Sequence, residues 1–126
     1  DLVAEAGTPT MVEGSAQRWF AEGFIGEHPE ISRALLHALQ QADRHSYAHA
    51  CFALSQFDLR PQLGGITRPV LAVAGAQDAV CPPAEAQFIA ESVPGARAQV
   101  LPGVAHLAPA EDPESTADLL KEHFLG

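Results

Sequence analysis

The chain has 126 residues, of which 47% are hydrophobic, so it is long and apolar enough for one domain with a buried core, though not comfortably for two. Its 16 acidic and 7 basic residues leave a formal net charge of −9. This balance argues against nucleic acid or an anionic membrane surface as a partner, because both require clustered Lys and Arg.

Helical signals dominate the first half of the chain. Apolar residues recur there at helical spacing, which predicts three short amphipathic helices, over residues 11–25, 28–41 and 46–57. In the third segment the expected apolar stripe consists of Tyr47, Ala50, Cys51 and Leu54.

After a Pro- and Gly-rich linker at residues 57–70, the pattern changes to alternating strands and helices. The predicted elements are a strand at 70–74, a helix at 83–93, a strand at 96–101 and a helix that begins after the N-cap Asp112. Alternation with short loops predicts an α/β fold with parallel strands. We therefore expect a helical region with linker over residues 1–65 and a βαβα segment over 66–126.

Two strands are too few for a stable open parallel sheet. The strand at 70–74 is almost continuously apolar, which is typical of a strand covered on both faces. The chain is therefore expected to supply the last part of a larger α/β domain, and the lack of an initial Met suggests a longer gene product. The acidic residues Glu111, Asp112 and Glu114 fit the positive end of the final helix and are not expected to bind a ligand.

Two residues whose side chains could take part in catalysis follow the two predicted strands. Asp78 comes just after the first strand, and His106 lies in the loop after the second. Because parallel strands end at the same edge of a sheet, we expect these side chains to meet. An Asp that accepts a hydrogen bond from imidazole fixes the tautomer and stabilises the imidazolium formed in catalysis. Taken singly, each residue has a simpler interpretation, as a turn former and as an inert loop histidine.

The order Asp then His, on consecutive strand ends, matches the chain order Ser…Asp…His of α/β-hydrolases. The segments PVLAVAGAQDAVCPP (69–83) and LPGVAHLAPAEDP (101–113) resemble the C-terminal part of that superfamily. The segments RWF (18–20), YAHACFALSQFDLRPQL (47–63) and ITRPVLAVAG (66–75) resemble the 3-oxoadipate enol-lactonases of aromatic-compound degradation.

This resemblance implies the C-terminal portion of an α/β-hydrolase fold, with the helices before the linker as a cap over the active site. Asp78 and His106 would be the acid and base of a catalytic triad. The implied reaction is hydrolysis of a lactone ester, 3-oxoadipate enol-lactone in the β-ketoadipate (protocatechuate) pathway, without metal or organic cofactor. Because that substrate carries a carboxylate, Arg18 is a candidate cation of the cap, with Trp19 beside it as a second substrate-binding residue. The alternative is that Arg18 is solvated and Trp19 is cap core.

The sequence departs from the family at the nucleophile. None of its serines lies in a G-x-S-x-G motif, and the family's oxyanion-hole loop is also absent. We therefore predict that the chain is inactive alone. Its expected partner is an N-terminal half that carries the nucleophilic Ser, in the same polypeptide or as a second chain.

Three alternatives remain open at this point. The fold could serve a general carboxylesterase or a cofactor-free haloperoxidase-like hydrolase instead. The chain could also be a helical binding module without catalytic activity, and association into homo-oligomers is open. Two cysteines without a disulfide pattern favour a reducing cytoplasm, and no apolar run approaches the ~20 residues of a membrane span.

Overall fold

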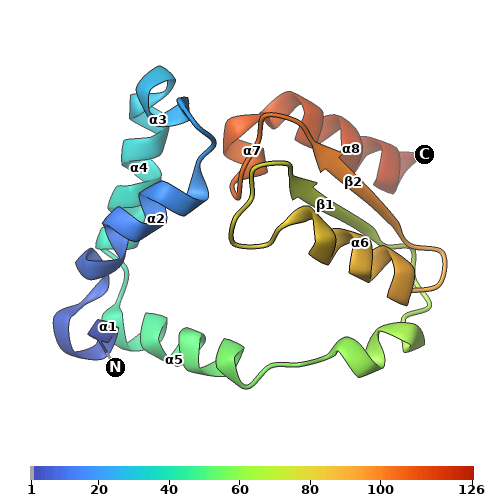
Figure 1. Cartoon of the computed structure of the whole chain (residues 1–126), viewed down its shortest axis with the longest axis horizontal. Helices are drawn as coiled ribbons and strands as arrows, with labels where there is room; N and C mark the ends of the chain where they lie inside the picture. Colours follow the sequence, from blue (N-terminus) through green and yellow to red (C-terminus); the bar gives the residue numbers. More distant parts are fainter. Residues whose placement is uncertain (1) are drawn as a thin grey trace.

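The computed structural model describes residues 2–126 (Figure 1). The first half of the described chain is helical, as expected, and contains more helical segments than the three predicted. They are α1 (Leu2–Ala6), the 3₁₀ turn η1 (Thr8–Met11), α2 (Val12–Trp19), α3 (Phe24–Glu27), α4 (Pro29–Gln40), α5 (Arg44–Ser55) and the 3₁₀ turn η2 (Arg60–Gly65). The turn η2 lies inside the stretch predicted to be a linker.

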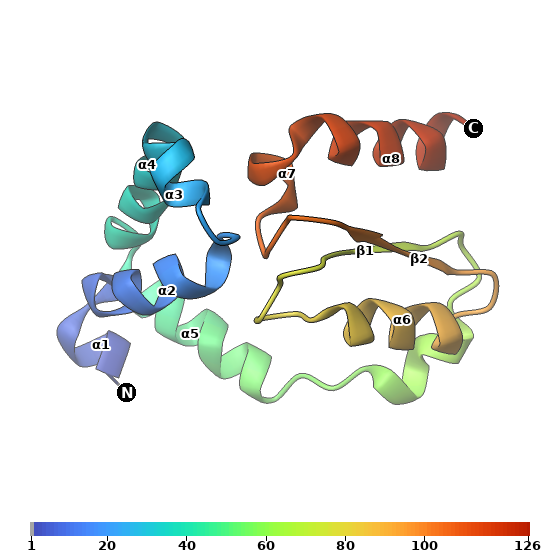
Figure 2. The same cartoon turned by 45° about the horizontal axis from the view of Figure 1, so that its top comes forward.

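The second half alternates strands and helices, as predicted. Its elements are β1 (Leu71–Gly75), α6 (Pro83–Ser92), β2 (Arg97–Leu101), α7 (Ala108–Glu111) and α8 (Pro113–Leu125). The two strands pair in parallel, with Leu71 opposite Arg97 and Gly75 opposite Leu101. Helices α6 and α8 lie on opposite sides of the strand pair (Figure 2). The side chain of Asp112 caps α8 by accepting a hydrogen bond from the backbone N–H of Ser115 at 3.0 Å.

The prediction of one helix over residues 11–25 is wrong. Helix α2 ends at Trp19, and Phe20 is extended, with φ −115° and ψ 144°. Gly23 then adopts φ 88°, a left-handed conformation that glycine enters without the steric cost of a Cβ. The rings of Phe20 and Phe24 still stack, with centroids 5.5 Å apart, so their spacing reflects packing across this turn rather than one continuous helix.

The strand pair is covered less completely than its sequence suggests. Between residues 2 and 126 the sheet consists of β1 and β2 alone. Ala74 and Leu101 are buried, whereas Val73 is 38% and Val100 is 40% exposed. Within the described residues, the helices on the two sides of the strand pair thus leave these valines partly exposed.

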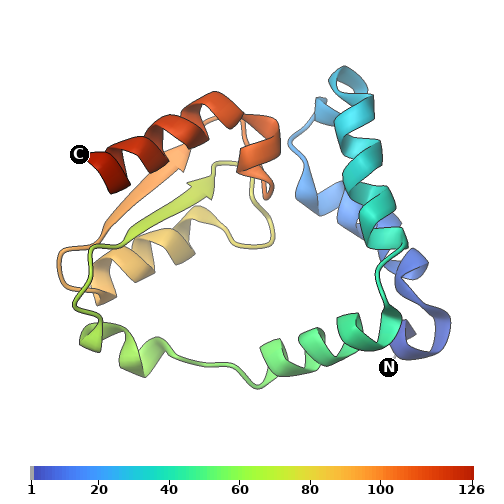
Figure 3. The same cartoon turned by 180° about the vertical axis from the view of Figure 1, so that it is seen from behind.

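Helix α5 also differs from expectation. Only Ala48 of this helix is buried, while Cys51 and Leu54 of the predicted apolar stripe are exposed, Leu54 to 71%. The helix runs along the outside of the molecule and leads into η2 (Figure 3). Helix α1 packs against α5, but beyond Ala48 the part of the helix that carries Cys51 and Leu54 stays uncovered within residues 2–126. No helix in this part of the chain is both long and apolar enough to cross a bilayer.

Candidate active site

The loops that follow β1 and β2 leave the same edge of the strand pair and are bonded to each other. The backbone N–H of Ala76 donates to the carbonyl of Leu101 at 2.9 Å, and that of Gln77 donates to Val104 at 2.9 Å. The parallel register, with Gly75 opposite Leu101, brings these groups within reach. The two loops therefore form one hydrogen-bonded unit beyond the end of the sheet.

Gly75 permits the close approach of the second loop. A Cβ placed on Gly75 would lie 2.1 Å from the carbonyl oxygen of Ala105 and 2.4 Å from that of Val104. Real Cβ atoms are not found at such distances, so a larger residue would have to displace this backbone. Ala105 directly precedes His106. The absence of a side chain at Gly75 therefore permits the backbone position from which His106 projects.

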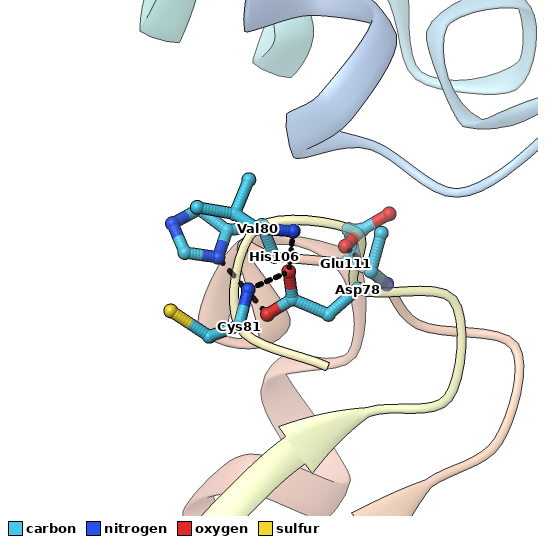
Figure 4. A network of polar contacts seen from close by, with 6 residues as sticks. Asp78, Val80, Cys81, His106 and Glu111 are labelled. Atoms are coloured by element: carbon cyan, nitrogen blue, oxygen red, sulfur yellow. Dashed lines mark hydrogen bonds and ion pairs between the residues drawn. The ribbon is translucent and has the colours of Figure 1, made fainter. Parts of the chain in front are cut away.

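Asp78 and His106 meet above this edge, as the sequence predicts (Figure 4). Nδ1 of His106 lies 3.0 Å from Oδ2 of Asp78. The other carboxylate oxygen accepts hydrogen bonds from the backbone N–H groups of Val80, at 2.8 Å, and Cys81, at 2.9 Å. The side chain of Asp78 is 6% exposed and that of His106 is 27% exposed. The carboxylate is thus enclosed and satisfied, while the imidazole keeps one side open.

The surroundings of Asp78 favour its ionised form. Burial by itself disfavours the charge, but the hydrogen bonds from the Cys81 backbone, the His106 side chain and the Val80 backbone outweigh that cost. Together they lower the pKa of Asp78 below its ordinary value. An ionised carboxylate can only accept hydrogen bonds, so Nδ1 of His106 must carry the proton of this contact.

This tautomer leaves the other ring nitrogen, Nε2, unprotonated on a neutral imidazole. Within residues 2–126 no serine hydroxyl is hydrogen-bonded to the His106 ring, whose side-chain partner is Asp78. The arrangement can therefore accept a proton at Nε2 and stabilise the resulting cation through Asp78. Chemically, it is an oriented general base.

The two residues considered for substrate binding occupy different positions. The half-buried Trp19 lies next to the base loop, since its carbonyl accepts the backbone N–H of His106 at 3.1 Å. The exposed Arg18 folds back along α2, where its guanidinium would be 2.9 Å from a Cβ placed on Gly14. The structure therefore brings Trp19 to the histidine loop, whereas the guanidinium of Arg18 lies a turn earlier on the helix.

Cys81 stands beside this pair and has the wrong electrostatics for a nucleophile. Partial burial of the thiol, followed by the negative charges of Asp78 and Glu85, raises the pKa of Cys81. Reactive cysteines instead need an environment that stabilises the thiolate.

Glu111 has a role that the sequence did not suggest. The sequence predicts only that this carboxylate complements the positive end of the final helix. Its Oε2 instead accepts the backbone N–H of Ala105 at 2.8 Å, and its Oε1 accepts that of Ala21 at 2.6 Å. No local sequence pattern indicates these contacts, because one of the two donors lies 90 residues away.

No family model matches the chain, whereas comparisons with single proteins find relatives. The chain is 41% identical over 114 residues to 3-oxoadipate enol-lactonase 2 of Acinetobacter baylyi, covering 90% of this chain and 42% of that protein. An esterase from Thermogutta terrifontis is 26% identical, with a TM-score of 0.89 over 95% of this chain and 44% of the esterase. The enol-lactonase of Burkholderia xenovorans, 24% identical, superimposes with a TM-score of 0.94 over 99% of this chain and 48% of that structure.

The chain thus spans less than half the length of these relatives. It has the fold of the C-terminal portion of an α/β-hydrolase, and its sequence resembles the C-terminal part of 3-oxoadipate enol-lactonase.

Proposed function

We propose that this chain supplies the acid and base of a serine hydrolase that opens a lactone ester. The observation that carries this proposal is the contact of 3.0 Å between Nδ1 of His106 and Asp78, made at the carboxyl ends of adjacent parallel strands. An enclosed, ionised carboxylate on one side of an imidazole and an open Nε2 on the other are the requirements of a triad base. Asp78 is therefore the acid and His106 the base.

The nucleophile comes from outside the chain in this proposal. The chain contains no G-x-S-x-G motif, and it corresponds to 42% of the curated relative. We infer that an N-terminal segment, in the same polypeptide or as a second chain, brings the serine and the oxyanion-hole donors. Val73 and Val100 are partly exposed, and because Val100 pairs with Ala74 they lie on opposite faces of the strand pair. Each face therefore offers an apolar contact for strands and helices of that segment. "Complete protein" below means this chain together with that N-terminal segment.

The reaction would proceed in two halves. Nε2 of His106 takes the proton of the serine hydroxyl as its oxygen attacks the lactone carbonyl. Collapse of the tetrahedral intermediate breaks the ring C–O bond, and the imidazolium returns the proton to the leaving oxygen. His106 then deprotonates a water molecule that attacks the acyl-enzyme, and the serine regains a proton as the acid is released. Asp78 stabilises the imidazolium in both halves.

The substrate we favour is 3-oxoadipate enol-lactone, an intermediate in the degradation of aromatic compounds. The support is the 41% identity to a protein named 3-oxoadipate enol-lactonase 2. In this proposal residues 1–65 form a cap and linker over the site, and residues 66–126 belong to the hydrolase core. Trp19 lines the acyl pocket beside the histidine loop, and Arg18 turns from its position over Gly14 to meet the substrate carboxylate.

A second candidate is a general carboxylesterase, favoured by the likeness to the esterase from Thermogutta terrifontis. The two functions are separated by assaying the complete protein on the enol-lactone and on p-nitrophenyl acetate. We expect a higher kcat/KM on the enol-lactone, and no turnover of either compound by the chain alone. Preference for p-nitrophenyl acetate would reject the lactonase in favour of the esterase. Turnover by the chain alone would reject a nucleophile from outside it.

A further inference from the structure

The extended segment between α2 and α3 is bonded to both catalytic loops. The carbonyl of Trp19 accepts the backbone N–H of His106 at 3.1 Å. The N–H of Ala21 donates to Glu111 at 2.6 Å, and the N–H of Glu22 donates to the side-chain oxygen of Gln77 at 3.1 Å. These contacts explain why the helix predicted over residues 11–25 breaks after Trp19. They also join the helical half of the molecule to the residues that flank Asp78 and His106.

Glu111 is the centre of this connection. One carboxylate oxygen accepts from Ala21, in the segment after α2, and the other accepts from Ala105, the residue before His106. Both donors belong to buried residues, since Ala105 is 2% and Ala21 is 8% exposed. Hydrogen bonds to a carboxylate are shorter and stronger than those between neutral groups, and a buried N–H without an acceptor is costly. Glu111 is the last residue of the short helix α7 and bridges the two donors.

We propose that Glu111 is a positioning residue for the base. By accepting the N–H of Ala105, it holds the backbone from which the His106 side chain projects. By accepting the N–H of Ala21 as well, it keeps the carbonyl of Trp19 against the N–H of His106. The backbone at His106 is thereby held at two points, the N–H of Ala105 and the N–H of His106 itself. Asp78, by contrast, orients only the imidazole ring. This inference rests on the function proposed above, because positioning matters only if His106 acts as a base.

A glutamine at this position tests the inference while keeping the size of the side chain. Gln offers one oxygen, so one of the two N–H groups would face the NH₂ group instead of an acceptor. In the complete protein we expect E111Q to lower kcat about 10- to 100-fold and to change KM less than about threefold, because misplaced catalytic groups affect the chemical step. The matched control is E114Q, which removes the same charge from the exposed Glu114 three residues away and should leave both parameters unchanged.

A second readout needs no substrate. The proton on Nδ1 of His106, held by Asp78, can be followed by NMR in the complete protein. We expect its resonance to shift or broaden in E111Q and to remain unchanged in E114Q. An unchanged kcat together with an unchanged resonance in E111Q would overturn the proposal, as would a loss of thermal stability without either effect. If the complete protein hydrolysed no ester, the proposed function would fail, and the NMR comparison alone would decide whether Glu111 positions the histidine.

Amide hydrogen exchange in the unaltered complete protein covers the case in which E111Q does not fold. Two N–H groups that share one carboxylate should both be protected, because they exchange only when that contact opens. We expect slow exchange at Ala21 and Ala105. The criterion is the exchange rate of each amide relative to the rate of the same residue in the unfolded chain. Exchange of both amides at their unfolded rates would overturn the proposal.

Discussion

The edge of the strand pair that carries Asp78 and His106, called the catalytic edge after the function we propose for it, differs from helix α5 in how its side chains are covered. At the edge, Asp78 is enclosed, and the loops around it are joined by backbone hydrogen bonds such as that from Gln77 to Val104, at 2.9 Å. Along α5, by contrast, Phe52 is 68% and Leu54 is 71% exposed. The comparison teaches that short polar contacts can define a site where apolar coverage is incomplete, whereas a helix placed by its apolar face needs a surface to cover it.

The largest effect is expected at the catalytic edge, from D78N in the complete protein. Asn keeps the size of the side chain but can present an NH₂ group to Nδ1 of His106, which favours the wrong tautomer of the ring. The corresponding change in a Ser-His-Asp triad lowers kcat by about 10⁴-fold, and we expect a loss of that order here. Steady-state kinetics on the enol-lactone provide the measurement.

The control for this change is D118N, at an aspartate whose side chain is 76% exposed on α8. It should leave kcat unaffected. Full activity of D78N would show that the acid lies elsewhere, and the edge would then be no more specialised than the surface of α5.

A smaller effect, on stability, is expected from replacing a glycine by alanine at the edge, and the matched control is the same replacement in the helical half. In G75A the new methyl group meets the carbonyls of Ala105 and Val104 and must displace them. We expect the free energy of unfolding to fall by about 1–3 kcal/mol, as is typical of overpacked sites. In G26A, on α3, the added Cβ has no neighbour within 4 Å, so the stability should not fall. Urea unfolding of both variants measures the difference, and equal stabilities would contradict the close approach at Gly75.

The smallest effect is expected in how the free energy of unfolding depends on pH in acid. Hydrogen bonds hold the pKa of Asp78 below its ordinary value of 3.8, against the opposing effect of burial. A lowered pKa in the folded state means that the contribution to stability is complete above pH 3.8 and is lost as the pH falls through the folded pKa. Unfolding measured in urea from pH 6 to about pH 2 should therefore show a loss at the acid end that is smaller in D78N.

Asp43, the N-cap of α5, supplies the matched comparison in the helical half. Its pKa is also lowered, mainly by the backbone N–H of Ser46, but its side chain is open to solvent. We expect D43N to change the acid dependence less than D78N does. A larger change in D43N would mean that the helical half, and not the catalytic edge, limits stability at low pH.

Apart from α7, which lies in a stretch predicted to be a loop, the elements of the second half begin within a residue or two of their predicted positions, because their signals are local. An apolar run bounded by Pro69 and Gly75 defines β1, and Asp112 followed by Pro113 defines the start of α8. The contact between Asp78 and His106 could also be anticipated, since parallel strands end at a common edge.

Other features could not be anticipated because they depend on distant parts of the chain. Helix α2 ends at Trp19 as Ala21 and Glu22 find acceptors in the catalytic loops, and Gly23 is the only local sign of that turn. Glu111 looks like an ordinary acidic residue before a helix until Ala21 is placed beside it. The stripe on α5 shows the opposite case: its periodicity predicts a helix correctly but cannot say whether anything covers its apolar face.

The bonded loops after β1 and β2 have a practical consequence for protein engineering. Asp78, His106 and Glu111 lie within a contiguous stretch of about 40 residues, from 69 to 111. Of the backbone groups bonded to them, those of Val80, Cys81 and Ala105 belong to this stretch, whereas those of Trp19 and Ala21 lie outside it. Such a stretch is a cassette that could be moved between hydrolases whose strands end in the same register. The recipient protein would have to supply an N–H donor for Oε1 of Glu111, in place of that of Ala21. Whether a chimera keeps this contact would indicate whether the transferred stretch fits its new surroundings.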